Sequence, residues 1–294
     1  MAHQTSLPSF TPAFAVETAP ETVPTPNASA EALVDGLNEA QAEAVLHRGG
    51  PLLIVAGAGS GKTRVLTHRI GHLLATGDAR PHEFLAITFT NKAAAEMRER
   101  IGELVGQAAQ RMWISTFHSS CVRILRREAT HISLKSNFSI YDATDSLRLI
   151  TQIAKDADID PRRFAPRAIR NKISSLKNEL VDDEAFAATA GGDPWHQAVA
   201  EVYKEYTSRL RTANAMDFDD LIANVVHMFD AFPAILDNYR RRFRHVLVDE
   251  YQDTNHAQYR LVRQLTGAPG EPPGVETEGG QLTVVGDSDQ SIYA

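Results

Sequence analysis

The chain has 294 residues, about twice the length of an ordinary domain, so we expect one large domain or two packed ones. Hydrophobic residues make up 43% and charged residues 23%, a globular composition that excludes a disordered, collagen-like or membrane-bundle protein. The 30 Lys and Arg against 37 Asp and Glu give a net charge of −7, so a site for a polyanion has to be local. Cys121 is the only cysteine, which excludes an internal disulfide and a cysteine-built zinc site.

Residues 1–35 are rich in Ala, Thr, Ser and Pro, and no Lys or Arg precedes Arg48. This composition predicts a disordered tail. A secretory signal needs a basic segment before an apolar run, and a transit peptide needs arginines, so neither is expected here. The apolar stretches are also shorter than a membrane span, so we expect a cytoplasmic protein with no membrane partner.

A strand, a glycine-rich loop and a helix are predicted in succession. Residues 51–56 form an apolar, β-branched run typical of a strand buried on both faces of a parallel sheet, and residues 64–74 have helical apolar spacing. Glycines let backbone N–H groups turn toward phosphate oxygens, and the helix N-terminus adds a positive dipole end. We therefore predict an ATP-binding loop made of Ala56, Gly57, Ala58, Gly59, Ser60, Gly61, Lys62 and Thr63.

Within this loop, Lys62 is expected to reach the β- and γ-phosphates as a catalytic residue, and the Thr63 hydroxyl to ligate Mg²⁺. Ala56 stands where the strict pattern has its first glycine, and it is the smallest replacement possible. The alternative is a Gly/Ser-rich turn that binds nothing. The strand before the loop and the helix after it favour the phosphate loop over that alternative.

Residues 243–248 form a second apolar strand that ends in two adjacent carboxylates. Neighbouring side chains of an extended chain point to opposite sides, so one carboxylate can face a metal ion and the other a water molecule. We assign Asp249 to Mg²⁺ and Glu250 to the polarisation of the attacking water. A solvated Asp-Glu turn is the alternative, and the pairing with Lys62 and Thr63 disfavours it.

A third strand, residues 282–285, runs into a Gly-Asp-Ser-Asp-Gln turn. Gln290 therefore emerges near the carboxyl end of a strand, where open α/β sheets place ligand contacts. Its amide can donate to a γ-phosphate and accept from the attacking water. We predict Gln290 as a catalytic residue that senses hydrolysis.

Seven motifs in order resemble those of UvrD/PcrA/Rep-type superfamily 1 DNA helicases, in an actinobacterial-like version, from about Gly36 to Ala294. The motifs are Leu37–Gln41, Ala56–Thr63, Thr88–Ala94, Ser115–Ser119, Asp217–Leu221, Val248–Thr254 and Val285–Tyr293. The resemblance implies that Gln41 reads the adenine and that Arg64 contacts the nucleotide. It also implies contacts to single-stranded DNA from Phe89, Thr90, Asn91, Thr116, Phe117, His118 and Tyr293.

Two further expectations concern these DNA-binding residues. Phe89 and Tyr293 are expected to stack on bases, a contact that tolerates any sequence, with core packing as the alternative. Asn91 can cap a helix over residues 92–104, whose first N–H groups would face a phosphate.

The resemblance implies an α/β fold: a RecA-like P-loop NTPase core with a parallel sheet, interrupted by an inserted, mostly helical subdomain. We expect the first part of the core at 36–116, the insert at 117–215 and the second part of the core at 216–294. Residues 116–180 hold twelve Lys and Arg against seven Asp and Glu, so this region could lie over DNA, or it could be a solvated face.

Several residues in or near the insert are expected to be structural. Trp113 is predicted in a core strand, Trp195 in the packing of the insert and Cys121 as a buried thiol. The basic run 240–242 is predicted as surface charge, and residues 267–280 as a flexible loop.

The family continues beyond the residue corresponding to Ala294 into a second RecA-like domain that supplies arginines to the transition state. We therefore expect this chain to bind Mg·ATP weakly, to hydrolyse it poorly and not to translocate. The resemblance implies that the intact protein is an ATP-dependent 3′-to-5′ DNA helicase of repair or replication, acting on single-stranded DNA and duplex junctions.

Three other interpretations remain open. The first is a non-catalytic module that binds nucleotide and DNA. The second is an ABC- or AAA-type ATPase, but the ABC class has an LSGGQ-like signature before the second carboxylate motif, where this chain has Asp-Phe-Asp-Asp. The third is a RecB/AddA-like nuclease-helicase, whose inserts are usually longer.

Overall fold

The computed structural model describes residues 29–57 and 59–287. Its helices are α1 (Glu39–Leu46), α2 (Lys62–Ala75), α3 (Asn91–Val105), α4 (Phe117–Glu128), α5 (Ala143–Asp156), α6 (Pro166–Asn178), α7 (Asp183–Thr189), α8 (Pro194–Thr212), α9 (Phe218–Ala231), α10 (Pro233–Arg242) and α11 (His256–Thr266). Its strands are β1 (Leu52–Val55), β2 (Phe84–Thr88), β3 (Trp113–Thr116), β4 (Ser139–Tyr141), β5 (Ala215–Asp217), β6 (His245–Val248) and β7 (Gln281–Gly286). No helix in these ranges is long and apolar enough to cross a membrane.

Five strands form one parallel sheet in the order β1-β7-β6-β2-β3, which confirms the predicted α/β class. All five residues of β2 are buried, as the continuous apolar run of a central parallel strand requires. Because the strands are parallel, their carboxyl ends meet at one edge of the sheet. The described residues that directly follow β1, β2, β3, β6 and β7 are therefore brought together there.

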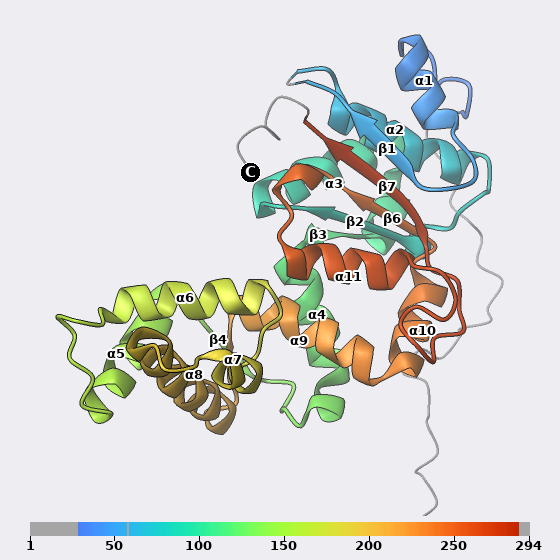
Figure 1. Ribbon diagram of the computed structural model, residues 1–294. Coiled ribbons are helices and arrows are strands. Elements are labelled where there is room, and N and C mark those ends of the chain that lie inside the picture. The colour runs from blue at the N-terminus through green and yellow to red at the C-terminus, as the bar shows by residue number, and fades with distance from the viewer. Residues whose placement is uncertain (1–28, 58, 288–294) are drawn as a thin grey trace, which may run out of the picture.

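Helices cover both faces of this sheet (Figure 1). On one face, α2 and α3 pack over a cluster that includes Leu66, Ile70 and Met97. On the other face, α4, α9 and α11 enclose a second cluster. Trp113 and Cys121 lie in that second cluster, at 3% and 0% exposure, which confirms their predicted core positions.

β1 is buried less than the sequence predicts. It lies at the edge of the sheet beside β7, and Leu53 and Val55 are 63% and 57% exposed. The prediction that both faces of this strand are buried was therefore wrong. Among the described residues, packing reaches only the face of β1 that carries Leu52 and Ile54, which contact the cluster between α1 and α2.

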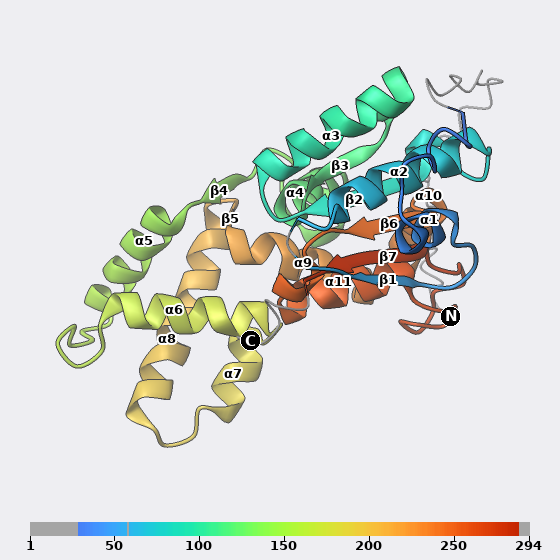
Figure 2. The same ribbon diagram turned by 90° about the horizontal axis from the view of Figure 1, so that it is seen from above.

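The helices α5, α6, α7 and α8 form a separate lobe beside the sheet domain (Figures 1 and 2). Their apolar faces share a cluster of their own, against which the half-buried Trp195 packs as predicted. The short strands β4 and β5 pair in parallel where the chain enters and leaves the lobe. By contrast, α4 contributes its buried face to the cluster under the sheet.

The segment before α1 is more ordered than a tail. Leu33 is 1% exposed and packs against α2, where a side chain on Gly71 would meet its methyl groups. The carbonyl oxygen of Leu33 also lies 2.8 Å from Nδ1 of His68. The predicted disordered tail therefore does not extend over residues 29–35, while residues 1–28 lie outside the described residues.

The prediction that residues 240–242 are all surface charge was wrong for Arg240, which is fully buried. Its guanidinium donates to the carbonyl oxygens of Gln264 (2.7 Å), Ala268 (3.1 Å) and Thr277 (2.8 Å). Burial lowers the pKa of Arg240. The arginine thus holds the turn-rich loop between α11 and β7, because a loop without regular structure needs partners for its carbonyl groups.

Candidate nucleotide and DNA sites

The glycine-rich loop connects β1 to the N-terminus of α2, as predicted. Gly59 and Gly61 have φ values of 74° and 85°, which glycine adopts without strain. Gly61 is the N-cap of α2 and has no side chain to cap it. The first N–H groups of the helix therefore point into the loop, the arrangement that binds phosphate at helix N-termini. Ala58 lies outside the described residues.

Ala56 occupies the position where the strict motif has glycine. Its N–H donates to the carbonyl oxygen of Gly286 at 3.1 Å, which extends the pairing of β1 with β7 by one residue. Ser60 stabilises the loop from within, because its hydroxyl donates to the carbonyl oxygen of Gly57 at 2.7 Å. Alanine at the first position is thus compatible with the pairing of β1 and β7.

Gln41 and Arg64 lie beside this loop. Gln41 belongs to the capping box of α1, and its Nε2 donates to the carbonyl oxygen of Ser60 at 2.9 Å. Gly61 leaves room for this amide, since a Cβ there would lie 3.1 Å from Gln41 Nε2. Arg64 is exposed on the first turn of α2.

The two carboxylates after β6 face different surroundings. The N–H of Asp249 continues the ladder by donating to the carbonyl oxygen of Ile87 at 3.0 Å, and Asp249 is 7% exposed. Glu250 takes the left-handed conformation, with φ 53° and ψ 45°. This conformation is costly for a residue other than glycine. The chain turns at Glu250 into the 3₁₀ turn Tyr251–Asp253.

Thr63 meets Asp249 where α2 begins. Burial and the charge of Glu250 raise the pKa of Asp249, while the charge of Lys62 and a hydrogen bond from Thr63 act in the opposite direction. Mg²⁺ in nucleotide sites takes one or two protein oxygens together with phosphate and water oxygens. A hydroxyl beside a carboxylate, next to a phosphate-binding helix end, fits that requirement.

Sequence reasoning missed the residue that pairs with Lys62. Lys62 Nζ lies 2.9 Å from Oδ2 of Asp287, and the two side chains are only 10% and 2% exposed. Asp287 follows β7 directly, at the same edge of the sheet as Asp249. The position of Asp287 directly after a predicted strand could have identified it as a candidate site residue. Only Gln290 of that segment was predicted as catalytic. Gln290 and Tyr293 both lie outside the described residues.

The predicted DNA-binding residues that the structure describes lie at the carboxyl ends of β2 and β3. Thr90 is exposed and caps α3, where its hydroxyl accepts from the N–H of Ala93 at 3.0 Å. The prediction that Asn91 is the cap was therefore wrong by one residue, because the helix already begins at Asn91. Thr116 caps α4 in the same way through the N–H of Ser119.

The aromatic residues of this region differ in access. Phe117 is 1% exposed and lies in the core cluster, so its ring is not available to a base in this structure. Phe89 is half-buried and meets Phe117 edge to face, with 5.6 Å between ring centroids, so it partly fulfils the packing alternative. His118 is also half-buried, and burial lowers its pKa.

Phe218 was not predicted as a site residue, yet it lies on the same surface. It is 48% exposed, and its ring centroid is 5.5 Å from that of His118. An aromatic directly after β5 and flanked by Asp217 and Asp219 is an unusual place for an apolar side chain. That flanking was the signal that sequence reasoning overlooked.

Residues 37–294 match the family described as the UvrD/REP helicase N-terminal domain, which covers most of the chain. The chain belongs to this family. It is 59% identical to the ATP-dependent DNA helicase UvrD1 of Mycobacterium tuberculosis (strain ATCC 25618 / H37Rv), over 90% of this chain and 34% of that protein. It is 51% identical to the ATP-dependent DNA helicase PcrA of Bacillus subtilis (strain 168), over 89% of this chain and 34% of that protein. The chain thus spans about a third of the length of these relatives.

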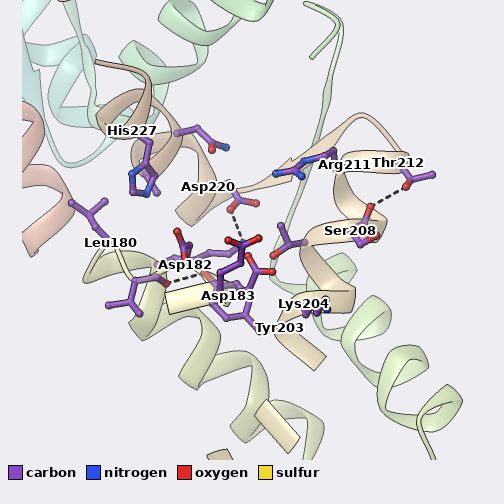
Figure 3. A pocket seen from close by; sticks show the side chains of 16 residues that line it. Leu180, Asp182, Asp183, Tyr203, Lys204, Ser208, Arg211, Thr212, Asp220 and His227 are labelled. Atoms are coloured by element: carbon purple, nitrogen blue, oxygen red, sulfur yellow. Dashed lines mark hydrogen bonds and ion pairs between the residues drawn. The ribbon is translucent and has the colours of Figure 1, made fainter. Parts of the chain in front are cut away.

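As a UvrD/REP helicase N-terminal domain, the chain brings the loop residues, Lys62, Thr63, Asp249 and Glu250 together at one edge of its sheet. A separate cavity of about 590 Å³ lies between α7, α8 and α9 (Figure 3). Its wall includes Asp182, Asp183 and His227. Burial raises the pKa of Asp183. This cavity contains none of the predicted site residues.

Proposed function

We propose that the chain is the first motor domain of an ATP-dependent DNA helicase, which binds Mg·ATP at the carboxyl edge of its sheet. The observation that carries the proposal is that Lys62 and Thr63, at the start of α2, meet Asp287 and Asp249, at the ends of β7 and β6. Segments far apart in sequence thereby bring the Lys62 ammonium, the Thr63 hydroxyl and the Asp249 carboxylate to one helix N-terminus, with Asp287 as the ion-pair partner that ATP would displace from Lys62. This donor set suits a magnesium-bound triphosphate.

Each residue has a defined part in the hydrolysis of ATP. Lys62 and the N–H groups of α2 would bind the β- and γ-phosphates, and Thr63 and Asp249 would hold Mg²⁺, which when bound would neutralise phosphate charge. The oxygen of water attacks the γ-phosphorus while the bond between the γ-phosphorus and the oxygen bridging the β- and γ-phosphates breaks. The electron pair of the broken bond stays on that oxygen, which leaves as part of ADP. Glu250 orients the water and accepts its proton. We retain Gln290 as the proposed sensor of the γ-phosphate.

We propose that single-stranded DNA crosses the ends of β2 and β3. The exposed Thr90 and Asn91 lie at the start of α3, where N–H groups and hydroxyls can meet a phosphate. Phe218 and His118 offer an aromatic surface beside them on which bases can stack. Because this surface and the nucleotide site share the loops of one sheet edge, a change at one can reach the other.

Translocation and unwinding belong to the proposed whole protein, with 3′-to-5′ polarity implied by the family resemblance. Arginines from a second domain are worth roughly 10³ to 10⁵ in rate for enzymes of this kind. We therefore expect the chain by itself to bind ATP and to hydrolyse it slowly.

The test compares Lys62→Ala with Lys155→Ala, a control at an exposed position on α5. We expect Lys62→Ala to weaken the binding of a fluorescent ATP analogue by about tenfold or more, because a charged hydrogen bond to phosphate is lost. Lys155→Ala should bind like the unchanged chain. Equal affinity of all three proteins for the ATP analogue, together with a DNA affinity that ATP does not change, would instead support a non-catalytic module.

A further inference from the structure

Gln252 joins two parts of the nucleotide site. It lies in the 3₁₀ turn Tyr251–Asp253 that follows Glu250. Its Nε2 donates to Glu250 Oε2 at 2.8 Å, and its Oε1 accepts from the N–H of Asp287 at 3.0 Å. The carboxylate of Asp287 in turn binds Lys62. One side chain thus spans from the end of β7 to the carboxylate after β6.

The chemistry of the two ends selects an amide at this position. A carboxylate can only accept a hydrogen bond, and a backbone N–H can only donate one. The side chain between them has to donate at one end and accept at the other, as glutamine does at neutral pH. Asparagine is one methylene shorter, and glutamate cannot donate when ionised.

The surrounding backbone leaves space for this contact. A Cβ on Gly286 would lie 3.3 Å from Gln252 Oε1, closer than most real Cβ contacts. Glu250 itself is in the left-handed conformation, which residues other than glycine adopt only at a cost. The hydrogen bond from Gln252 Nε2 is a contact that can hold the Glu250 carboxylate in one direction.

We propose that Gln252 is a positioning residue, which orients the Glu250 carboxylate by tying it to the backbone of Asp287. The proposed general base Glu250 and the lysine Lys62 are then both linked to Asp287. Glu250 is linked through Gln252, and Lys62 through its ion pair. This inference rests on the proposed function, because it requires Glu250 to act on the attacking water. It assigns to Gln252 a role in hydrolysis that requires no contact between its side chain and ATP.

The experiment measures single-turnover hydrolysis with the 294-residue chain in excess over radiolabelled ATP, so that slow product release does not mask the step. We expect Gln252→Leu to lower the rate constant by about tenfold or more, since small misplacement of a catalytic group is costly. The dissociation constant for ATP should change less than about twofold. Gln252→Glu keeps the acceptor toward Asp287 but loses the donor to Glu250, so it should show the same loss.

A double-mutant cycle distinguishes positioning from general damage to the fold. If Gln252 acts through Glu250, then Gln252→Leu has no further effect on the rate in a Glu250→Gln background. Thr254→Ala is the matched control, because it removes a 2.8 Å hydrogen bond to Tyr251 in the same turn without touching Glu250. Its rate should equal that of the unchanged chain.

The outcomes separate the two proposals. An unchanged rate in Gln252→Leu, or equal rate losses from this change in both backgrounds, would overturn the positioning role. A Glu250→Gln chain that hydrolyses ATP as fast as the unchanged chain would instead overturn the proposed function. Gly286→Ala gives a further check, since it crowds Gln252 without removing a donor or acceptor, and it should lower the rate as well.

Discussion

The ion pair between Lys62 and Asp287 places a carboxylate where phosphate oxygens are proposed to bind. Both side chains are nearly buried, so the pair is screened little by solvent. ATP then has to displace Asp287 from Lys62, and the remaining carboxylate repels the phosphates. We predict that Asp287→Asn binds ATP about tenfold more tightly than the unchanged chain, as measured by equilibrium titration.

Asp287→Glu is the control for this prediction, because it keeps the charge and lengthens the side chain by one methylene. Its affinity for ATP should stay close to that of the unchanged chain. Weaker binding by Asp287→Asn would show that the carboxylate supports the nucleotide instead of competing with it.

At the scale of a single element, β6 begins with a half-buried histidine. The ring of His245 stacks on Phe84 with 5.0 Å between centroids, and burial lowers its pKa to about 4 from the usual 6.5. The unfolded chain therefore binds this proton more readily than the folded chain does. The contribution to stability is full above pH 6.5 and is lost as pH falls toward 4, by roughly 2 kcal/mol at pH 5.

We predict that His245→Phe loses less stability than the unchanged chain when pH is lowered from about 7.5 to about 5. Urea unfolding at the two pH values measures this difference. Comparing the two proteins cancels the effect of carboxylates elsewhere in the chain. An equal loss in both would show that His245 accepts a proton in the folded strand at no cost.

At the scale of the whole molecule, a buried lysine connects the helical lobe to the sheet domain. Lys177 on α6 is 5% exposed, and its Nζ lies 2.8 Å from Asp217 and 2.7 Å from Asp220, at the start of α9. Tyr206 on α8 also donates to Asp217 at 2.9 Å. The junction between the two parts is therefore held by a desolvated ionic cluster. Asp220 faces the cavity beside α7 and α8 (Figure 3).

We predict that Lys177→Met lowers the free energy of unfolding by about 3 to 5 kcal/mol, because it leaves two buried carboxylates without their cation. Hydrogen exchange should accelerate first in α5, α6, α7 and α8. Replacing Asp217 and Asp220 by Asn in the same chain should restore much of the loss. Uniform acceleration over the sheet as well would contradict a role confined to the junction.

Much of the candidate site could be predicted because its signals are local. Apolar runs that end in Gly-Ser-Gly-Lys-Thr or Asp-Glu specify a strand and the chemistry that follows it within a few residues. The parallel sheet then brings those strand ends together without further information. The loop, Lys62, Thr63, Asp249 and Glu250 are therefore found where the sequence predicts them.

The positions that were missed or corrected depend on contacts between segments far apart in the chain. Arg240 is buried because carbonyl groups of the loop before β7 surround it, and Leu53 is exposed because its strand lies at an edge. Phe117 is buried because α9, which begins about a hundred residues later in the chain, packs against α4.

The sequence by itself predicted the fold class, the family and the candidate residues of a nucleotide site, because apolar runs and the order and spacing of motifs can be read along the chain. Only the tertiary structure decided which partners those residues have. Asp287 on Lys62, Gln252 on Glu250 and Phe218 beside His118 are contacts across strands and domains. These contacts form only when separate elements pack together, and no local pattern in the chain specifies that packing.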